Sequence, residues 1–143
     1  MHLILDGYGG DPQKLQDLEH IYQLLDSYPT RIGMTKIMPP YVFRYHGSKP
    51  QDWGVSGFVL IAESHISIHT FPERSYLNVD IFSCKSFDAE RALENLRKEF
   101  KLSRVETRLL HRGLEYPTSI EDATPIVMEE RLELAGQPRG DRS

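Results

Sequence analysis

Apolar and polar residues follow two different periods along this chain, and these periods predict the order of its elements. Apolar residues at 3.6-residue spacing predict one helix that begins at Asp11 and Pro12, an N-cap and a first helical position. A second helix is predicted after Asp88, again with an aspartate as N-cap. The two apolar stripes consist of Leu15, Leu18, Ile21, Tyr22, Leu24 and Leu25, and of Ala89, Ala92, Leu93, Leu96 and Phe100.

Six segments with period-two alternation or continuous apolar runs predict β-strands. They are residues 2–8, a strand-rich stretch at 31–46 that Pro39 and Pro40 interrupt, 54–62, 63–71, 76–84 and 105–111. The order β-α-β-β-β-β-α-β predicts an α+β fold: a mostly antiparallel β-sheet with two helices packed on one face, as a two-layer sandwich. We expect one domain at residues 1–114 and a polar, loosely ordered tail at 115–143, in which only 126–134 could be helical.

The predicted strand around residue 66 carries unusual side chains on its polar face. Ile66 and Ile68 alternate with His65, Ser67 and His69. Two imidazoles and a hydroxyl can all donate or accept protons near neutral pH, whereas the outer face of an ordinary strand carries Thr, Lys or Glu. A single histidine on a strand usually has a structural role. This combination, closed by Pro-Glu and followed by the chain's one cysteine, instead indicates a chemical site.

Composition limits the class of protein. The chain has 143 residues, of which 39% are hydrophobic and 27% charged, and a net charge of −4 without a basic cluster. These values predict a globular domain that binds neither nucleic acid nor an anionic membrane surface. One cysteine excludes an internal disulfide, and residues 2–5 are too short an apolar run for a signal or transmembrane segment. We therefore expect a cytoplasmic protein in which Cys84 is reduced.

Three kinds of site fit the residue types around this strand. A zinc site could use His65, His69 and Cys84, but residues four apart on a strand are separated by about 13 Å. No CxxC or HExxH motif is present, so no metal is expected. A nucleophile paired with a histidine, at Ser64 or Cys84, stays open, although neither a nucleophile elbow nor an oxyanion hole is marked. The third kind is a site assembled by strand pairing.

Strand pairing would bring Cys84 near the start of the polar-faced strand. If the intervening turn centres near Arg74, Cys84 lies opposite Ser64, or opposite His65 after a slip of one residue. A free cysteine is as often simply a small buried residue, so position alone leaves its role open. His69 follows Ser64 by five residues, about 16 Å along a regular strand, and cannot easily reach it within one chain. If both act in one centre, the histidine comes from a second copy, which indicates a symmetric dimer.

Three segments together resemble one known family. They read GVSGFVLIAESHISIHTFPE, NVDIFSC and, at the start of the chain, HLILDGYG. Over residues 2–113 the chain closely resembles the S-adenosylmethionine decarboxylase family in its short prokaryotic form. The resemblance implies a proenzyme that cuts itself between Glu63 and Ser64 into a β chain, residues 1–63, and an α chain. Ser64 would become a pyruvoyl group, with no metal and no pyridoxal phosphate. Short members of the family are dimers, so we expect a homodimer of αβ protomers that associates through its sheets.

The resemblance also implies a role for each site residue. His69, as the proton-handling group, and Ser56 would assist self-cleavage, and Cys84 would return a proton to the substrate's α-carbon. Glu73 would hold the ribose hydroxyls of the substrate, and Phe71 would stack on adenine, although core packing could also explain Phe71. The pyruvoyl carbonyl would form a Schiff base with the substrate's α-amine and accept electrons as CO₂ leaves.

The family's reaction implies a substrate and a pathway. S-adenosylmethionine would yield CO₂ and decarboxylated S-adenosylmethionine, the aminopropyl donor for spermidine in polyamine biosynthesis. Two departures leave alternatives open, because residues 47–53 form a longer loop than in many relatives and Lys85 replaces a common glycine. The same chemistry could serve arginine or ornithine, with specificity set by Phe71, Glu73, Tyr45 and this loop. A non-catalytic regulatory homologue is a further alternative, although the complete set of reactive residues argues against it.

Overall fold

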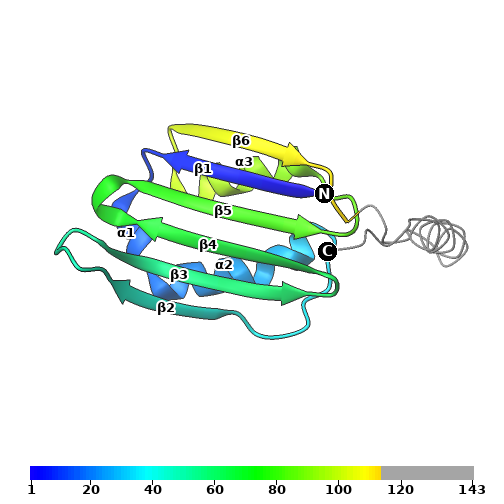
Figure 1. The fold of residues 1–143 in the computed structure, drawn as a ribbon, viewed down its shortest axis with the longest axis horizontal. Helices are drawn as coiled ribbons and strands as arrows, with labels where there is room; N and C mark the ends of the chain where they lie inside the picture. Colours follow the sequence, from blue (N-terminus) through cyan, green and yellow to red (C-terminus); the bar gives the residue numbers. More distant parts are fainter. Residues whose placement is uncertain (114–143) are drawn as a thin grey trace, which may run out of the picture. The chain divides into compact units, whose positions relative to one another are not determined.

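A six-stranded antiparallel sheet with helices on one face makes up residues 1–113, the part of the chain that the computed structural model describes (Figure 1). The strands are β1 (His2–Tyr8), β2 (Tyr41–His46), β3 (Trp53–Ile61), β4 (Ser64–Phe71), β5 (Tyr76–Ser83) and β6 (Arg104–Leu110). The helices are α1 (Pro12–Gln16), α2 (Leu18–Arg31), the 3₁₀ turn η1 (Pro72–Arg74) and α3 (Ala89–Phe100). The predicted tail at 115–143, with its segment 126–134, lies outside the described residues, and the domain boundary at 114 stays a prediction.

The strand order is β2-β3-β4-β5-β1-β6, which places β4 and β5 in the middle of the sheet. Each neighbouring pair is antiparallel. The two main helices, α2 and α3, lie behind the sheet in Figure 1, on the same face. This arrangement confirms the predicted α+β fold. None of the described helices is long and apolar enough to span a membrane.

The first predicted helix is in fact two helices, and Asp17 is the reason. Its backbone is extended (φ −82°, ψ 102°), so that α1 ends there, and its carboxylate accepts a hydrogen bond from the backbone N–H of His20 as the N-cap of α2. Leu15 before the break and Leu25 after it are both fully buried. The apolar spacing therefore continues across the break and hides it in the sequence.

The prediction of a strand at 31–46 is wrong for residues 31–40. Helix α2 extends to Arg31, and regular strand structure begins only at Tyr41, after the two prolines. Proline has no N–H to donate to a neighbouring strand, so pairing cannot run through this segment. Before the prolines, Lys36 makes a single isolated β-bridge with Ile61.

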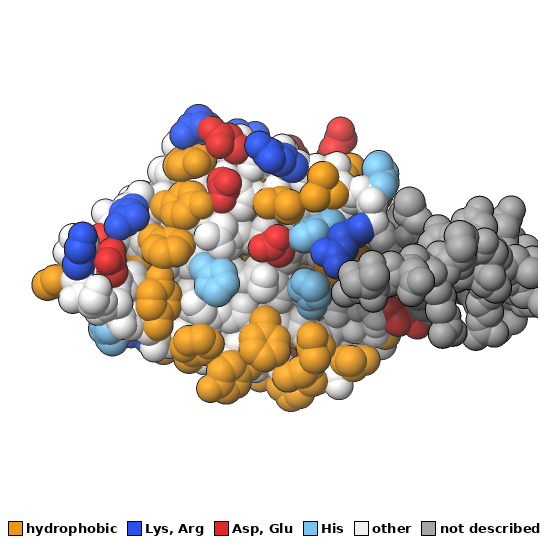
Figure 2. Space-filling view, viewed as in Figure 1, with side chains coloured by type: hydrophobic (Ala, Val, Ile, Leu, Met, Phe, Trp, Pro, Cys, Tyr) orange, Lys and Arg blue, Asp and Glu red, His pale blue; other side chains and the backbone are white. Residues whose placement is uncertain are grey.

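The two faces of the sheet differ in polarity. On one face, alternate strand residues such as Leu5, Ile66 and Ile68 join Tyr28 of α2 and Phe100 of α3 in a continuous buried core. On the opposite face no helix lies over the strands within residues 1–113, and Figure 2 shows histidines near its middle and hydrophobic side chains along its margins.

Large hydrophobic side chains are exposed on β2 and β3 of this open face. They include Tyr41 (57% exposed), Phe43 (43%), Phe58 (37%) and Leu60 (41%). A contiguous apolar surface of this kind commonly marks a site of association.

Thr70 joins β3, β4 and α1 where the regular pairing of β3 with β4 ends. Its buried hydroxyl accepts a hydrogen bond from the Val55 N–H (3.0 Å) and donates one to the Leu15 carbonyl (2.6 Å). Valine has nearly the same shape but leaves these buried groups without their partner. We expect Thr70→Val to lower the free energy of unfolding by about 2 kcal/mol, measured by urea denaturation. The control Ser27→Ala, in α2, should change it by less than about 0.5 kcal/mol, and equal effects of both would contradict this account.

Candidate active site

The polar face of β4 points away from the helices. Ile66 and Ile68 are buried in the core, whereas His65, Ser67 and His69 lie on the open face of the sheet. This confirms the alternation that the sequence predicts. These three polar side chains therefore lie on a surface that a substrate or a second protein can reach.

Ser64 begins β4 directly after a strained turn. Ile61 and Ser64 pair at the base of a hairpin whose turn consists of Ala62 and Glu63. Glu63 has a φ of 62°, in the left-handed region that residues other than glycine rarely adopt. Holding a residue with a Cβ there costs roughly 1–2 kcal/mol. The predicted scissile bond, between Glu63 and Ser64, thus starts from a strained residue.

The predicted pairing of Cys84 with Ser64 or His65 is wrong. β4 and β5 pair so that Ser64 lies opposite Ser83, and the half-buried Cys84 follows that residue. The error has a geometric cause: the connection 72–75 contains an even number of residues, so the hairpin centres between two residues and not on one. Cys84 nevertheless lies only one position beyond the residue opposite Ser64.

A small cavity of about 130 Å³ opens beside Ser64. Most of its lining residues are small or carry a hydroxyl. The full lining consists of Gly33, Met34, Thr35, Ala62, Ser64, Ser83, Lys85 and Ser86. Lys85 contributes the one cationic residue of this lining. The cavity is thus polar, and large enough only for a small group attached to Ser64.

His69 and Ser56 form a hydrogen-bonded pair farther along β4. They lie directly opposite each other in the β3–β4 register, with 2.8 Å between Ser56 Oγ and His69 Nδ1. Ser56 is only 6% exposed, whereas His69 is exposed on the open face. The buried hydroxyl holds the imidazole in place and leaves Nε2 for a second proton partner. The structure therefore brings together the two residues to which the resemblance assigns self-cleavage.

Phe71 and Glu73 lie beyond this pair, among aromatic side chains. The centroid of the Phe71 ring is 5.4 Å from that of Tyr76 and 6.3 Å from that of Tyr45. The Glu73 carboxylate accepts a hydrogen bond from the indole N–H of Trp53, with 3.2 Å between Nε1 and Oε1. Sequence reasoning missed Tyr76, and it included Trp53 only as the last residue of the loop 47–53. Hairpin pairing opposite Phe71 could have revealed Tyr76, whereas no local pattern indicates the position of the Trp53 indole.

The site residues therefore form two groups at opposite ends of β4. Ser64 and Cys84 make up the first group, and His69, Phe71 and Glu73 belong to the second. Because β4 pairs regularly with β5 over its whole length, Ser64 and His69 are separated by about 16 Å. A single chain does not bring the two groups together.

His65 belongs to a separate group on the open face. Its ring centroid is 5.5 Å from that of Phe82, and nearby His2 Nε2 is 2.9 Å from Asp80 Oδ1. Burial, followed by the neighbouring His2, lowers the pKa of His65. Across residues 1–113, no three His, Cys, Asp or Glu side chains converge in a way that could hold a metal ion.

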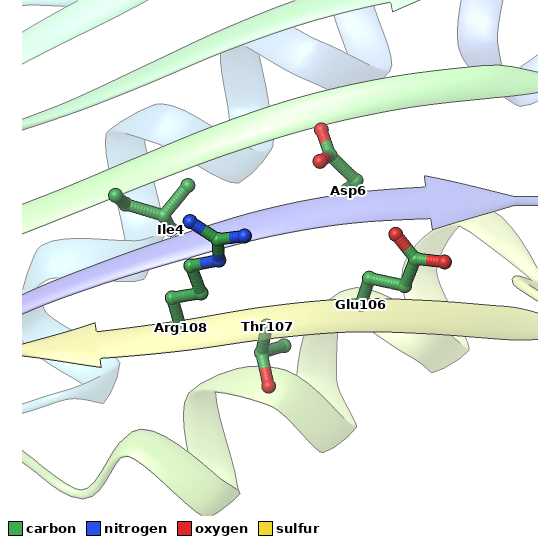
Figure 3. Close-up of a pocket in the computed structure, with 5 residues that line it drawn as sticks. All are labelled: Ile4, Asp6, Glu106, Thr107 and Arg108. Carbon is green, nitrogen blue, oxygen red and sulfur yellow. The ribbon is translucent and has the colours of Figure 1, made fainter.

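A larger pocket, of about 360 Å³, lies over β1 and β6 (Figure 3). It is lined by Ile4, Asp6, Glu106, Thr107 and Arg108. Tyr76 donates a hydrogen bond to Asp6 (2.6 Å) and so connects the pocket to the aromatic group. None of the predicted site residues lines it, and it is chemically distinct from the site on β4.

Known proteins share both the fold and the sequence of this chain. The family model described as S-adenosylmethionine decarboxylase matches residues 1–113. The S-adenosylmethionine decarboxylase proenzyme of Pyrococcus furiosus is 31% identical over 133 residues, 92% of this chain and 91% of the relative. The proenzyme of Clostridium botulinum strain Langeland is 35% identical over 113 residues, 78% of this chain and 92% of the relative. The crystal structure of the adenosylmethionine decarboxylase from Aquifex aeolicus VF5 superimposes with a TM-score of 0.66 at 31% identity, and covers 82% of this chain and 93% of that chain.

Fold, site and relatives together define a class of protein, a carboxy-lyase made as a proenzyme. Within that class, the chain belongs to the S-adenosylmethionine decarboxylase family. The resemblance stated from the sequence is confirmed, whereas the roles of the individual residues stay predictions.

Proposed function

We propose that this chain is a self-processing, pyruvoyl-dependent decarboxylase that converts S-adenosylmethionine to decarboxylated S-adenosylmethionine and CO₂. One observation carries the proposal: Ser64 follows a strained Glu63 at the head of β4 and lines a small polar cavity. Proenzyme relatives that are matched over more than 90% of their own length support it.

Self-cleavage begins at the peptide bond between Glu63 and Ser64. The Ser64 hydroxyl gives up its proton to a base, and its Oγ attacks the Glu63 carbonyl carbon. The C–N bond then breaks as the departing amine takes up a proton, which leaves an ester in place of the amide. β-Elimination across Ser64 releases residues 1–63 with a new carboxylate, and hydrolysis of the remaining enamine, with loss of ammonia, leaves a ketone at the head of the α chain.

The residues beside Ser64 fit this pyruvoyl group. The cavity of about 130 Å³ accommodates a small ketone, and its polar lining, including Ser83 and Ser86, suits a carbonyl oxygen. When bound to substrate, the group would withdraw electrons from the α-carbon as CO₂ leaves. Cys84, one position beyond the residue opposite Ser64, would supply the proton that the α-carbon then requires. A thiol suits this task because its S–H can donate a proton.

A symmetric dimer would complete the site. When two sheets pack face to face about a two-fold axis, the Ser64 end of one β4 can lie over the His69 end of the other. The partner's His69, held by Ser56 of its own chain, would then be the base for Ser64. The exposed hydrophobic side chains of β2 and β3 provide apolar surface for this contact.

The adenosyl group of the substrate would bind in the aromatic region. Phe71, with Tyr45 and Tyr76 around it, offers aromatic surface for a purine. Glu73 would accept hydrogen bonds from the ribose hydroxyls. Arginine is a second candidate substrate, because the exposed Glu73 carboxylate could pair with a guanidinium as well.

The test combines cleavage with turnover. The purified protein is incubated in parallel with S-adenosylmethionine, arginine and ornithine, and CO₂ release is measured beside a denaturing gel. We expect two fragments, divided after Glu63, and CO₂ from S-adenosylmethionine. Release of CO₂ from arginine or ornithine alone would overturn the assignment of S-adenosylmethionine as the substrate. An uncut chain without any turnover would support the non-catalytic alternative instead.

Strain at Glu63 predicts an effect on the rate of self-cleavage. Glycine adopts a φ of 62° without steric cost, so Glu63→Gly removes strain from the uncut chain and leaves Ser64 in place. Because breaking the bond releases this strain in the wild type, we expect cleavage of the variant to be roughly five- to thirtyfold slower. The measurement is the rate at which the full-length chain disappears on a denaturing gel.

Ser75 provides a matched control for this substitution. It has a φ of 49° in the turn between β4 and β5, away from the scissile bond. Ser75→Gly removes similar strain and should leave the cleavage rate unchanged. Glu63→Ala removes the carboxylate but keeps the strain, and should cleave much faster than Glu63→Gly. Equal cleavage rates for the two Glu63 variants would refute the claim that backbone strain at this residue accelerates self-cleavage.

A further inference from the structure

Glu73 is exposed, and its carboxylate is hydrogen-bonded to a residue outside the turn in which it lies. It lies on η1, a three-residue 3₁₀ turn, where a free carboxylate could adopt several rotamers. The indole N–H of Trp53, the first residue of β3, donates a hydrogen bond to Glu73 Oε1 at 3.2 Å. One oxygen of the carboxylate is thereby fixed, and the other keeps both lone pairs for further donors.

Trp53 is itself anchored to the rest of the domain. The Arg44 guanidinium lies over the indole ring, 5.8 Å from its centroid, in a cation–π contact. The same guanidinium donates a hydrogen bond to the backbone carbonyl of Gln16, at the end of α1 (3.1 Å). A continuous set of contacts thus connects α1, through Arg44 and Trp53, to the Glu73 carboxylate.

A second contact fastens the same loop to the same turn. Asp52, directly before Trp53, forms an ion pair with Arg74, directly after Glu73, with 3.1 Å between Asp52 Oδ1 and Arg74 Nη2. The loop itself is closed by a hydrogen bond from the Gly47 N–H to the Asp52 carbonyl. Residues 52 and 53 therefore hold η1 through two adjacent interactions. Both residues belong to the segment 47–53, the loop in which this chain departs from the family pattern.

We propose that Trp53 is a positioning residue, which fixes the Glu73 carboxylate in the orientation that receives the vicinal ribose hydroxyls of the substrate. This inference rests on the proposed function, because the ribose is that of S-adenosylmethionine. Trp53 acts on binding only, because its indole contacts Glu73, the proposed ribose ligand, and Arg44, and neither Glu73 nor Arg44 takes part in the proposed self-cleavage. Loss of the indole N–H would free the Glu73 side chain, which would then have to be ordered again each time substrate binds.

The kinetic test uses Trp53→Phe, which keeps an aromatic ring beneath Arg44 and loses the N–H. We expect KM for S-adenosylmethionine to rise roughly five- to tenfold, with kcat and the rate of self-cleavage within about twofold of the wild type. In a Glu73→Gln background the same substitution should have a much smaller effect on KM, because the charged acceptor is gone. Tyr22→Phe, on the half-buried side of α2, is the matched control and should change neither constant.

Fluorescence provides a readout that does not depend on turnover. Trp53 is the chain's one tryptophan, so tryptophan emission reports on the surroundings of this indole alone. Glu73→Gln should alter the emission of the folded protein, and the control Glu90→Gln on α3 should not. An unchanged emission in Glu73→Gln, or an unchanged KM in a Trp53→Phe enzyme that cleaves and turns over normally, would overturn this inference alone. A wild-type protein that does not decarboxylate S-adenosylmethionine would instead overturn the proposed function and, with it, the assignment to ribose.

Discussion

Ser64→Ala should give a single uncut chain of 143 residues that releases no CO₂ from any substrate. Alanine has no Oγ, so neither the attack on the Glu63 carbonyl nor the later β-elimination can take place. The variant should also lack the ketone that borohydride reduces in the cleaved wild type. Intact mass spectrometry measures cleavage, and incorporation of hydride from labelled borohydride measures the carbonyl. We expect both signals to fall below detection.

Ser67→Ala is the control for loss of a serine hydroxyl on the same strand. Ser67 lies three residues farther along β4, on the open face, and is half-buried like Ser64. This variant should cleave between Glu63 and Ser64 and turn over as the wild type does. Fragments divided at that bond in Ser64→Ala would show that another nucleophile cuts the chain, and the proposed function would then be wrong. A folded, uncut Ser64→Ala chain with full activity would show that no ketone is needed.

Local patterns in the sequence were sufficient to predict the sheet and its polar-faced strand. Alternation of Ile66 and Ile68 with polar residues identified β4 and its two faces, because the side-chain period of a strand depends only on the backbone. Apolar spacing identified α3 and most of α2, because the side-chain period of a helix likewise depends only on the backbone. The resemblance implied roles in self-cleavage for Ser56 and His69, and the register of two adjacent strands places their side chains within hydrogen-bond distance.

Features that depend on contacts between distant segments could not be predicted in this way. Asp17 divides the first helix because its carboxylate accepts a hydrogen bond from a backbone N–H, although the apolar period is continuous across it. The opposition of Ser64 and Ser83 depends on the number of residues in the η1 turn, and an error of one residue moved Cys84 out of register. Trp53 reaches Glu73 from the first position of β3, directly after a loop without periodicity, so no sequence pattern could indicate this contact.

His69→Ala should slow self-cleavage by at least about a hundredfold. A positioned base that removes the proton from an attacking hydroxyl typically contributes that much, and the buried Ser56 hydroxyl cannot replace an imidazole. The time course of cleavage on a denaturing gel, in the purified precursor, measures the effect. His46→Ala, at the end of β2, is the matched control and should cleave at the wild-type rate. A His69→Ala rate close to wild type would remove this histidine from the reaction.

The origin of the histidine can be tested by mixing two inactive chains. A His69→Ala chain keeps Ser64, and a Ser64→Ala chain keeps His69, so a dimer that contains one of each has one complete site. About 16 Å along β4 separate the two residues within a chain, so in the proposed face-to-face dimer only the mixed pair would place an intact histidine beside an intact serine. After co-expression in equal amounts, we expect about half of the His69→Ala chains to be cut at a normal rate, since random pairing puts half of them in mixed dimers. If His69 served the serine of its own chain, mixing would leave every His69→Ala chain uncut, and the face-to-face dimer would lose its main support.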